Sequence, residues 1–149
     1  MFTGLQPLNR AARVRKVVRA PVVGGNMAVL QSGLGTPSAL DPRGEIIFFE
    51  DIGERPHRVD RMLEQFKQAG WFKSARAVVF GQFILQNSVD RRGLWNDVVP
   101  RFAASVAIPV LKGLPVGHDP RAQRTLPFNT RAELHLGAAA KLVVKSGIT

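Results

Sequence analysis

The chain has 149 residues, of which 45% are hydrophobic and 21% charged, a composition typical of one globular domain with its own core. No apolar run approaches the roughly 20 residues that span a bilayer, and no signal pattern opens the sequence, so we expect a cytoplasmic protein without membrane contact. The absence of cysteine excludes disulfides, thiolate metal sites and a cysteine nucleophile.

The charge is strongly basic: 21 Lys and Arg against 11 Asp and Glu give a net charge of +10, which raises nucleic acid as a partner. Only one segment is dense in cations, and it contains Arg10, Arg13, Arg15, Lys16 and Arg19. No aromatic residue stands among these positions to stack on bases. The pattern therefore favours a solvated basic arm, or a surface that faces an acidic partner, over a nucleic-acid site.

The amino-terminal part predicts little regular structure before residue 14. Residues 1–13 show no apolar periodicity, and we expect a loose segment there. A strand is predicted at 14–19, followed by a turn at Pro21 and the pair Gly24-Gly25. Asn26 is a suitable N-cap for a short helix.

The stretch from Gly44 to Arg61 is the most informative of the chain. Residues 46–49 (IIFF) form an unbroken apolar run, which predicts a strand buried on both faces. Glu50 and Asp51 follow it, and ligands and catalytic groups collect at the carboxyl ends of strands in α/β sheets. Spacing alone favours two solvated acids that precede a helix over a catalytic pair.

A helix is predicted from about residue 56 to 69. Pro56 suits its first turn, and Gly70 is a C′ stop. Its apolar positions recur at helical spacing: Val59, Met62, Leu63 and Phe66. A second strand is predicted at 75–80, ended by Gly81, so residues 45–80 have the strand, helix and strand series of a βαβ crossover.

The second half predicts smaller elements. A helix over 94–102 is weakened or kinked by Pro100, and a short strand follows at 107–112. Residues 114–127 form a loop, and alternation predicts a closing hairpin within 131–145. No repeat and no linker divides the chain. The series predicts an α/β fold with a mixed sheet and flanking helices.

Three histidines remain to be weighed. His135 alternates outward in the hairpin, and His57 lies in the first turn of the helix that starts at Pro56. His118 lies in a loop that follows a strand, where functional residues concentrate. A carboxylate fixes an imidazole's tautomer and stabilises its charged form, so Glu50 and His118 are a candidate pair, although their spacing leaves their proximity open.

Seven blocks of the sequence are informative together: VVGGNMAVL (22–30), LGTP (34–37), FFEDIGERPHRVDRML (48–63), AGWF (69–72), VVFGQF (78–83), IPVLKGLPVGH (108–118) and TLPF (125–128). In the same order, they resemble the carboxy-terminal domain of the LD-carboxypeptidase family (serine peptidase family S66), which includes the microcin C immunity peptidase. The resemblance implies a swivelling β/β/α-type domain over residues 14–149, after the loose segment 1–13.

The resemblance also implies a serine peptidase with a Ser-Glu-His triad that cleaves an L,D amide without a metal or cofactor. By position, Glu50 matches the triad acid and His118 the triad base. The implied reaction is loss of terminal D-alanine from a murein tetrapeptide in cytoplasmic peptidoglycan recycling, with a microcin-type substrate as the alternative.

The sequence departs from this family at the nucleophile. The family's serine and oxyanion hole belong to a separate amino-terminal domain, and this chain begins roughly where that domain would end. None of its serines matches the family's serine block: Ser32, Ser38, Ser74, Ser88, Ser105 and Ser146. We therefore expect a truncated peptidase half that is inactive alone.

Two kinds of partner follow from that expectation. A separate serine-bearing domain would complete the triad, and an apolar surface that such a domain covers could instead drive homodimerisation. A non-catalytic remnant or a basic binding module is the alternative function.

Overall fold

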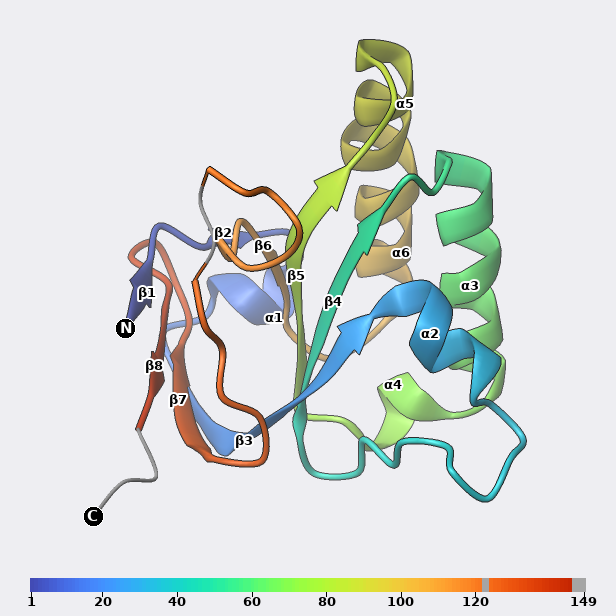
Figure 1. Cartoon of the computed structure of the whole chain (residues 1–149). Coiled ribbons are helices and arrows are strands. Elements are labelled where there is room, and N and C mark those ends of the chain that lie inside the picture. Colours follow the sequence, from blue (N-terminus) through green and yellow to red (C-terminus); the bar gives the residue numbers. More distant parts are fainter. Residues whose placement is uncertain (122–123, 146–149) are drawn as a thin grey trace.

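The computed structural model describes residues 1–121 and 124–145, and its centre is an eight-stranded mixed sheet (Figure 1). The strand order is β1-β8-β7-β3-β4-β5-β6-β2. The strands are β1 (Phe2–Thr3), β2 (Gln6–Pro7), β3 (Val17–Asn26), β4 (Ile46–Ile52), β5 (Ala77–Ile84), β6 (Val110–Lys112), β7 (Arg131–His135) and β8 (Lys141–Val144). Strands β3 to β6 are parallel, and the others pair antiparallel.

The larger helices gather on one side of the parallel strands, and the β7–β8 hairpin and the loop after β6 lie on the other (Figure 1). The helices are α1 (Arg10–Arg13), α2 (Met27–Ser32), α3 (Pro56–Gln68), α4 (Trp71–Ser74), α5 (Ser88–Gly93), the π-helix η1 (Leu94–Val98) and α6 (Val99–Ser105). The predicted α/β fold with a mixed sheet and flanking helices is confirmed. None of the described helices has the length and apolar character needed to cross a membrane.

Strand β4 separates two hydrophobic cores, because its side chains alternate between the two faces of the sheet. Ile47 and Phe49 pack into the core under the helices, while Ile46 and Phe48 pack into the core under the hairpin. All four are at most 1% exposed, which confirms the predicted doubly buried strand. Strands β4 and β5 are parallel and are joined through α3 and α4, so the βαβ crossover is confirmed as well.

The predicted turn at Pro21 and Gly24-Gly25 is wrong, because all three residues lie inside the ten-residue strand β3. Gly24 has φ +138°, and a Cβ there would lie 1.9 Å from the carbonyl oxygen of Phe48. The glycine therefore allows the close approach of β3 to β4 rather than a turn. The carboxyl half of β3 pairs with β4, and its amino half pairs with β7.

Gly81 does not end β5 as predicted, because the strand continues to Ile84. A Cβ at Gly81 would lie 2.5 Å from the Val116 carbonyl oxygen and 2.5 Å from the Phe48 ring. The small residue lets the loop after β6 lie directly against the strand, and the backbone N–H of Gln82 donates to Val116 O at 2.9 Å.

Residues 1–13 are ordered, which contradicts the expected loose start. β1 pairs with β8 and β2 with β6, so the segment provides both edge strands of the sheet. Phe2 and Leu5 are buried in the core beneath the hairpin. The strands that pair with β1 and β2 lie more than 100 residues away in the sequence. A two-residue strand is too short to show a sequence pattern that would predict such pairing.

The other predicted helices and strands are present, with bounds that differ by a few residues from the prediction. Helix α3 starts at Pro56, and Gly70 adopts φ +82° directly after its C-cap. The helix around Pro100 changes from π to α geometry one residue before the proline. The strand predicted at 107–112 is shorter, and the closing hairpin is present as β7 and β8.

Candidate active site

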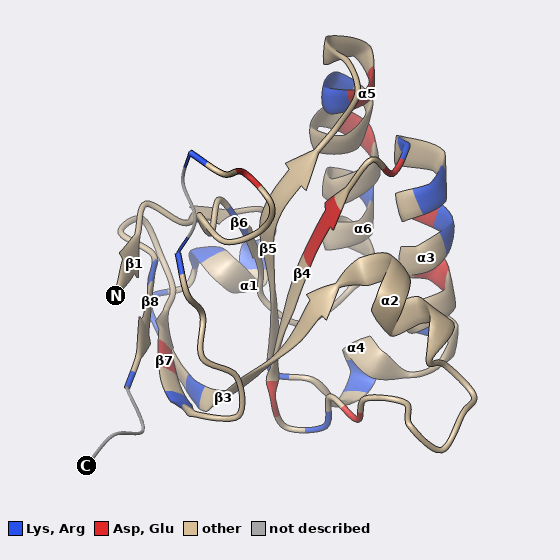
Figure 2. Cartoon of the chain, in the orientation of Figure 1, with Lys and Arg blue, Asp and Glu red and all other residues tan. Residues whose placement is uncertain are grey.

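Glu50 lies near the carboxyl end of β4, between its neighbours β3 and β5. Its backbone is opposite Asn26 of β3, and the register with β5 shifts between Phe49 and Asp51. Its side chain is only 7% exposed. The prediction allowed two solvated acids at this point, but Glu50 and Asp51 are both buried, inside the strand rather than beyond it (Figure 2).

His118 reaches Glu50 from the loop that follows β6. Its Nδ1 lies 2.6 Å from Glu50 Oε2, a short hydrogen bond between side chains 68 residues apart in the sequence. The imidazole is 49% exposed, so one edge contacts the carboxylate while the rest of the ring faces solvent. The structure thus brings together the two residues that the sequence singled out.

The loop around His118 is held to β5 on both sides of the histidine. The N–H of Gln82 donates to Val116 O, and the N–H of Asp119 donates to Gln82 Oε1 at 3.1 Å. Gly117 lies between them with φ +153°, where a Cβ would lie 2.7 Å from Gln82 Cβ. Gln82 therefore positions the backbone that carries His118, and no local sequence pattern indicates this role.

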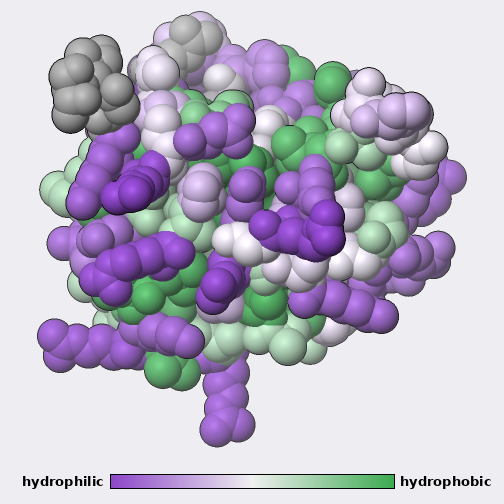
Figure 3. Space-filling model, turned by 90° about the horizontal axis from the view of Figure 1, so that it is seen from below, coloured by the Kyte–Doolittle hydropathy of each residue, from purple (hydrophilic) through white to green (hydrophobic). Residues whose placement is uncertain are grey.

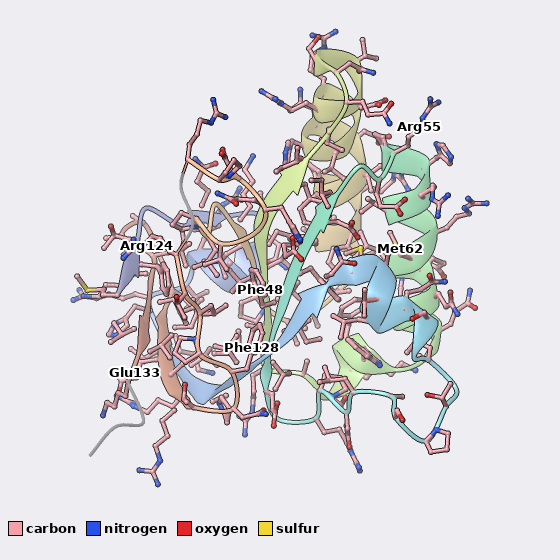
Figure 4. The ribbon with its side chains drawn as sticks, in the orientation of Figure 1. Phe48, Arg55, Met62, Arg124, Phe128 and Glu133 are labelled. Carbon is pink, nitrogen blue, oxygen red and sulfur yellow. The ribbon has the colours of Figure 1, made fainter. Side chains whose placement is uncertain are left out.

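Farther along the same loop, an aromatic contact fastens the chain to the sheet. Phe128 packs over Phe48, with ring centroids 6.1 Å apart (Figure 4). Phe48 is two residues before Glu50 and points to the same face of β4. The loop therefore covers that face of the strand next to the Glu50 carboxylate.

Asp51 points to the opposite face and organises the start of α2. Its Oδ2 accepts from the backbone N–H of Ala28 at 3.0 Å, and its Oδ1 accepts from the Asn26 side chain at 3.2 Å. A carboxylate at a helix N-terminus satisfies N–H groups that have no partner within the helix. Asp51 therefore anchors the start of α2, and its Oδ1 also accepts from the N–H of Ile52.

Other charged residues nearby form local pairs. Arg58 Nε lies 2.6 Å from Oε2 of Glu54, which stands four residues earlier, just before the start of α3. Hydrogen bonds from Arg121 hold the pKa of Asp119 below its ordinary value. His135 lies 3.5 Å from Glu133 on the hairpin, far from Glu50 in the fold.

This geometry can perform general acid–base chemistry. When Nδ1–H donates to the carboxylate, Nε2 has a free lone pair that can accept a hydroxyl proton, and Glu50 stabilises the resulting imidazolium. Within residues 1–121 and 124–145, no serine or threonine hydroxyl is hydrogen-bonded to His118. The same residues contain no group of three His, Asp or Glu side chains that could hold a metal ion.

Comparison with known proteins places these residues in a family. The family model of the LD-carboxypeptidase C-terminal domain matches residues 19–134, which include both Glu50 and His118. The chain belongs to the LD-carboxypeptidase family. A Bacillus subtilis relative named a probable murein peptide carboxypeptidase is 32% identical over 130 residues, which are 86% of this chain and 40% of that protein.

Solved structures agree on the LD-carboxypeptidase fold. The muramoyltetrapeptide carboxypeptidase of Oxalobacter formigenes superposes with a TM-score of 0.77 at 32% identity, over 97% of this chain and 50% of that one. The microcin C7 self-immunity protein MccF has a TM-score of 0.76 at 21% identity, over 98% of this chain and 42% of its own, and this likeness concerns the fold alone. The chain spans about 40% of the length of the curated relatives it matches.

Proposed function

We propose that this chain is the carboxy-terminal half of an LD-carboxypeptidase and provides the base and the acid of its catalytic triad. The 2.6 Å contact between His118 Nδ1 and the buried Glu50 carboxylate carries the proposal. The family match supports it, since both residues lie within the matched range.

The proposed reaction is hydrolysis of the amide that joins a terminal D-alanine to an L-centre of a murein tetrapeptide. A serine oxygen attacks the amide carbon while His118 Nε2 takes the serine proton. The tetrahedral intermediate collapses and breaks the C–N bond, and the imidazolium gives its proton to the leaving amine. Water then attacks the acyl ester, with His118 again as the base, and the acid product and free serine are released.

The serine and the oxyanion hole must come from a further domain. Two exposed apolar side chains at the carboxyl ends of β3 and β4 support its docking here: Val29 on α2 is 68% exposed, and Ile52 at the end of β4 is 48% exposed. Asp51 links their segments, because its carboxylate accepts from the backbone N–H groups of Ala28 and Ile52. A domain that covers this surface would lie at the carboxyl ends of β3 and β4, where Asn26 and Glu50 are paired.

The substrate proposed is a murein tetrapeptide, and the place of reaction is cytoplasmic cell-wall recycling. Relatives named for murein peptides support this class. A microcin-type substrate has support only from the fold likeness to MccF, whose structures include a complex with glutamyl sulfamoyl guanosine.

Release of D-alanine from a murein tetrapeptide tests the proposal. The chain is assayed alone and again with a separately expressed amino-terminal domain from a related enzyme. We expect release only in the mixture, and its loss in His118→Ala. His135→Ala is the matched control, since His135 also faces a glutamate but lies on the hairpin. Release that survives His118→Ala would overturn the assignment of the base.

A further inference from the structure

A groove of about 850 Å³ opens beside the His118 loop. Its walls come from the carboxyl end of β5, from α5 and η1, from the end of β6 and from residues 119–121. Asp119, which lines it, directly follows His118, so the groove begins one residue from the imidazole. The triad chemistry makes no use of this space.

The groove is lined by basic side chains. Four cations line it, namely Arg91, Arg92, Lys112 and Arg121, together with one carboxylate, Asp119. Asp119 is paired with Arg121 at 3.1 Å. Four cations and one carboxylate leave three positive charges, and Arg91, Arg92 and Lys112 form no ion pair with any residue in the described part of the chain. Figure 2 shows cationic segments on α5 and at the tip of the loop.

The charge of this groove lines a concave wall. A second basic hollow, of about 940 Å³, lies beside the β7–β8 hairpin, but none of its lining residues belongs to the His118 loop. Figure 3 shows the opposite end of the molecule, where hydrophilic side chains alternate with hydrophobic patches. Cations that line a concave, low-dielectric wall focus their potential on the space between them. Such a hollow attracts an anionic ligand more strongly than the same charges on an open surface.

Trp95 indicates which kind of anion fits. It belongs to the π-helix η1, a rare geometry that is frequent at functional sites. The Lys112 ammonium lies 5.2 Å from the Trp95 ring centroid, and the Phe83 ring packs against Trp95 at 5.8 Å. The indole therefore holds a cation over its ring, and the face that Lys112 covers is not free to stack on a nucleobase.

We propose that this groove binds the carboxylates of an anionic peptide substrate and so holds the scissile amide beside His118. The inference rests on the proposed peptidase function and deepens it, since it names the substrate feature that is recognised. A murein tetrapeptide carries carboxylates on its acidic residues in addition to its terminal one. Arginine binds carboxylates through two parallel N–H groups, which gives both attraction and orientation.

The test is titration of the full chain with murein tetrapeptide and with an analogue whose side-chain carboxylates are amidated. The double variant Arg91→Gln/Arg92→Gln removes two charges from the groove. Arg61→Gln/Lys67→Gln on α3 is the control, because it removes the same charge outside the groove. We expect the tetrapeptide Kd to rise about tenfold in the groove variant and to stay within about twofold in the control. The amidated analogue should bind the native chain about as weakly as the tetrapeptide binds the groove variant.

Three results would overturn the groove assignment: equal weakening in both variants, no saturable binding to the native chain, or displacement of the peptide by single-stranded RNA at lower concentration. Hydrolysis in the complemented mixture separates this inference from the peptidase proposal. Hydrolysis with an unchanged KM in the groove variant would exclude the groove and leave the peptidase standing. Groove-dependent binding without any hydrolysis would support the groove and count against the peptidase.

Discussion

Glu50 is a carboxylate placed in a largely apolar interior, where an ionised group is stable only if it is paired. Its side-chain hydrogen bond within the described residues goes to His118. Such a partner serves an imidazole in two ways: it fixes the tautomer that leaves Nε2 free, and it stabilises the positive charge after proton uptake. The two effects can be separated by a substitution that keeps the shape of the side chain and removes its charge.

Glu50→Gln is that substitution. We expect D-alanine release in the complemented mixture to fall by roughly 10²–10⁴-fold, because a neutral amide no longer stabilises the imidazolium. The urea midpoint should show that the chain still folds. Glu133→Gln is the control, since Glu133 faces His135 on the surface and its loss should leave release unchanged. Activity within about threefold of the native value in Glu50→Gln would contradict the role assigned to Glu50.

Asp119 gives a second prediction, on pH dependence. Its side-chain hydrogen bond from Arg121 holds its pKa below the ordinary 3.8. A depressed folded-state pKa contributes stability that is present above the unfolded value and lost as pH falls through the folded one. The Asp119–Arg121 ion pair is therefore intact at about pH 6.5, where imidazoles ordinarily titrate.

We accordingly expect Asp119→Asn to leave the pH profile of D-alanine release between pH 5 and 8 unmoved. Its effect should appear in stability instead: the variant should be less stable than the native chain at neutral pH, and the difference should disappear as the pH falls below about 4, in urea unfolding followed by circular dichroism. If Asp119→Asn shifted the dependence of D-alanine release on pH between pH 5 and 8, this carboxylate would act on His118 directly.

At the scale of elements, the sequence predicted those with a strong local pattern. Helix α3 follows from apolar residues at helical spacing, and the buried part of β4 follows from four consecutive apolar residues. The site could be predicted as two residues, because a motif points to Glu50 and His118 separately. Their contact could not be predicted. It depends on the hydrogen bonds by which Gln82 holds the loop, and on glycines that let the loop lie close to the strand. Glycine predicts a turn by propensity, and nothing local distinguishes a turn from a close approach of two strands.

Gly24 and Gly25 allow that distinction to be measured. Both have φ near +140°, so alanine is strained at either position, but only Gly24 has the Phe48 carbonyl oxygen in the way, at 1.9 Å from the added Cβ. We expect Gly24→Ala to be about 1–3 kcal/mol less stable than Gly25→Ala in urea unfolding, because β3 must move away from β4. Equal free energies of unfolding for the two variants would mean that the space beside Gly24 is not limiting.

Asp51 provides the corresponding prediction for helix α2. Asp51→Ala removes the acceptor of the Ala28 N–H and of the Asn26 side chain, and we expect it to lower the free energy of unfolding by about 1–3 kcal/mol. Asp41→Ala is the control, because Asp41 pairs with Arg43 on an exposed loop and its loss should not move the urea midpoint measurably. A midpoint in Asp51→Ala equal to that of Asp41→Ala would show that the helix start does not depend on this carboxylate.

At the scale of the whole molecule, the first residues close the fold. One short segment pairs with the last strand through β1 and with the last parallel strand through β2, so it joins the two opposite edges of the sheet (Figure 1). The curled sheet thereby encloses the core that contains Phe2 and Leu5. The sequence could not predict this, because the stability of so short a strand comes from its partners and not from its own residues.

Asn9 is the residue that ties this segment to the rest of the chain. Its amide group donates to the carbonyl oxygens of Ala103 and Ile108 at 3.0 and 2.9 Å, and its Oδ1 accepts from the N–H of Val110 at 3.2 Å. Oδ1 also accepts from Ala12 N and so caps helix α1. One buried side chain therefore joins the amino-terminal segment to α6 and β6.

We expect Asn9→Ala to lower the free energy of unfolding by about 2–4 kcal/mol, since it leaves several buried backbone groups without partners. Asn87→Ala is the matched control, because Asn87 is also an N-cap but bonds only within its own helix turn, and its loss should cost about 1 kcal/mol. Both values come from urea unfolding of the full chain. If the two variants were equally destabilised, Asn9 would be no more than a helix cap, and the closure of the sheet would depend on the β1 and β2 pairings alone.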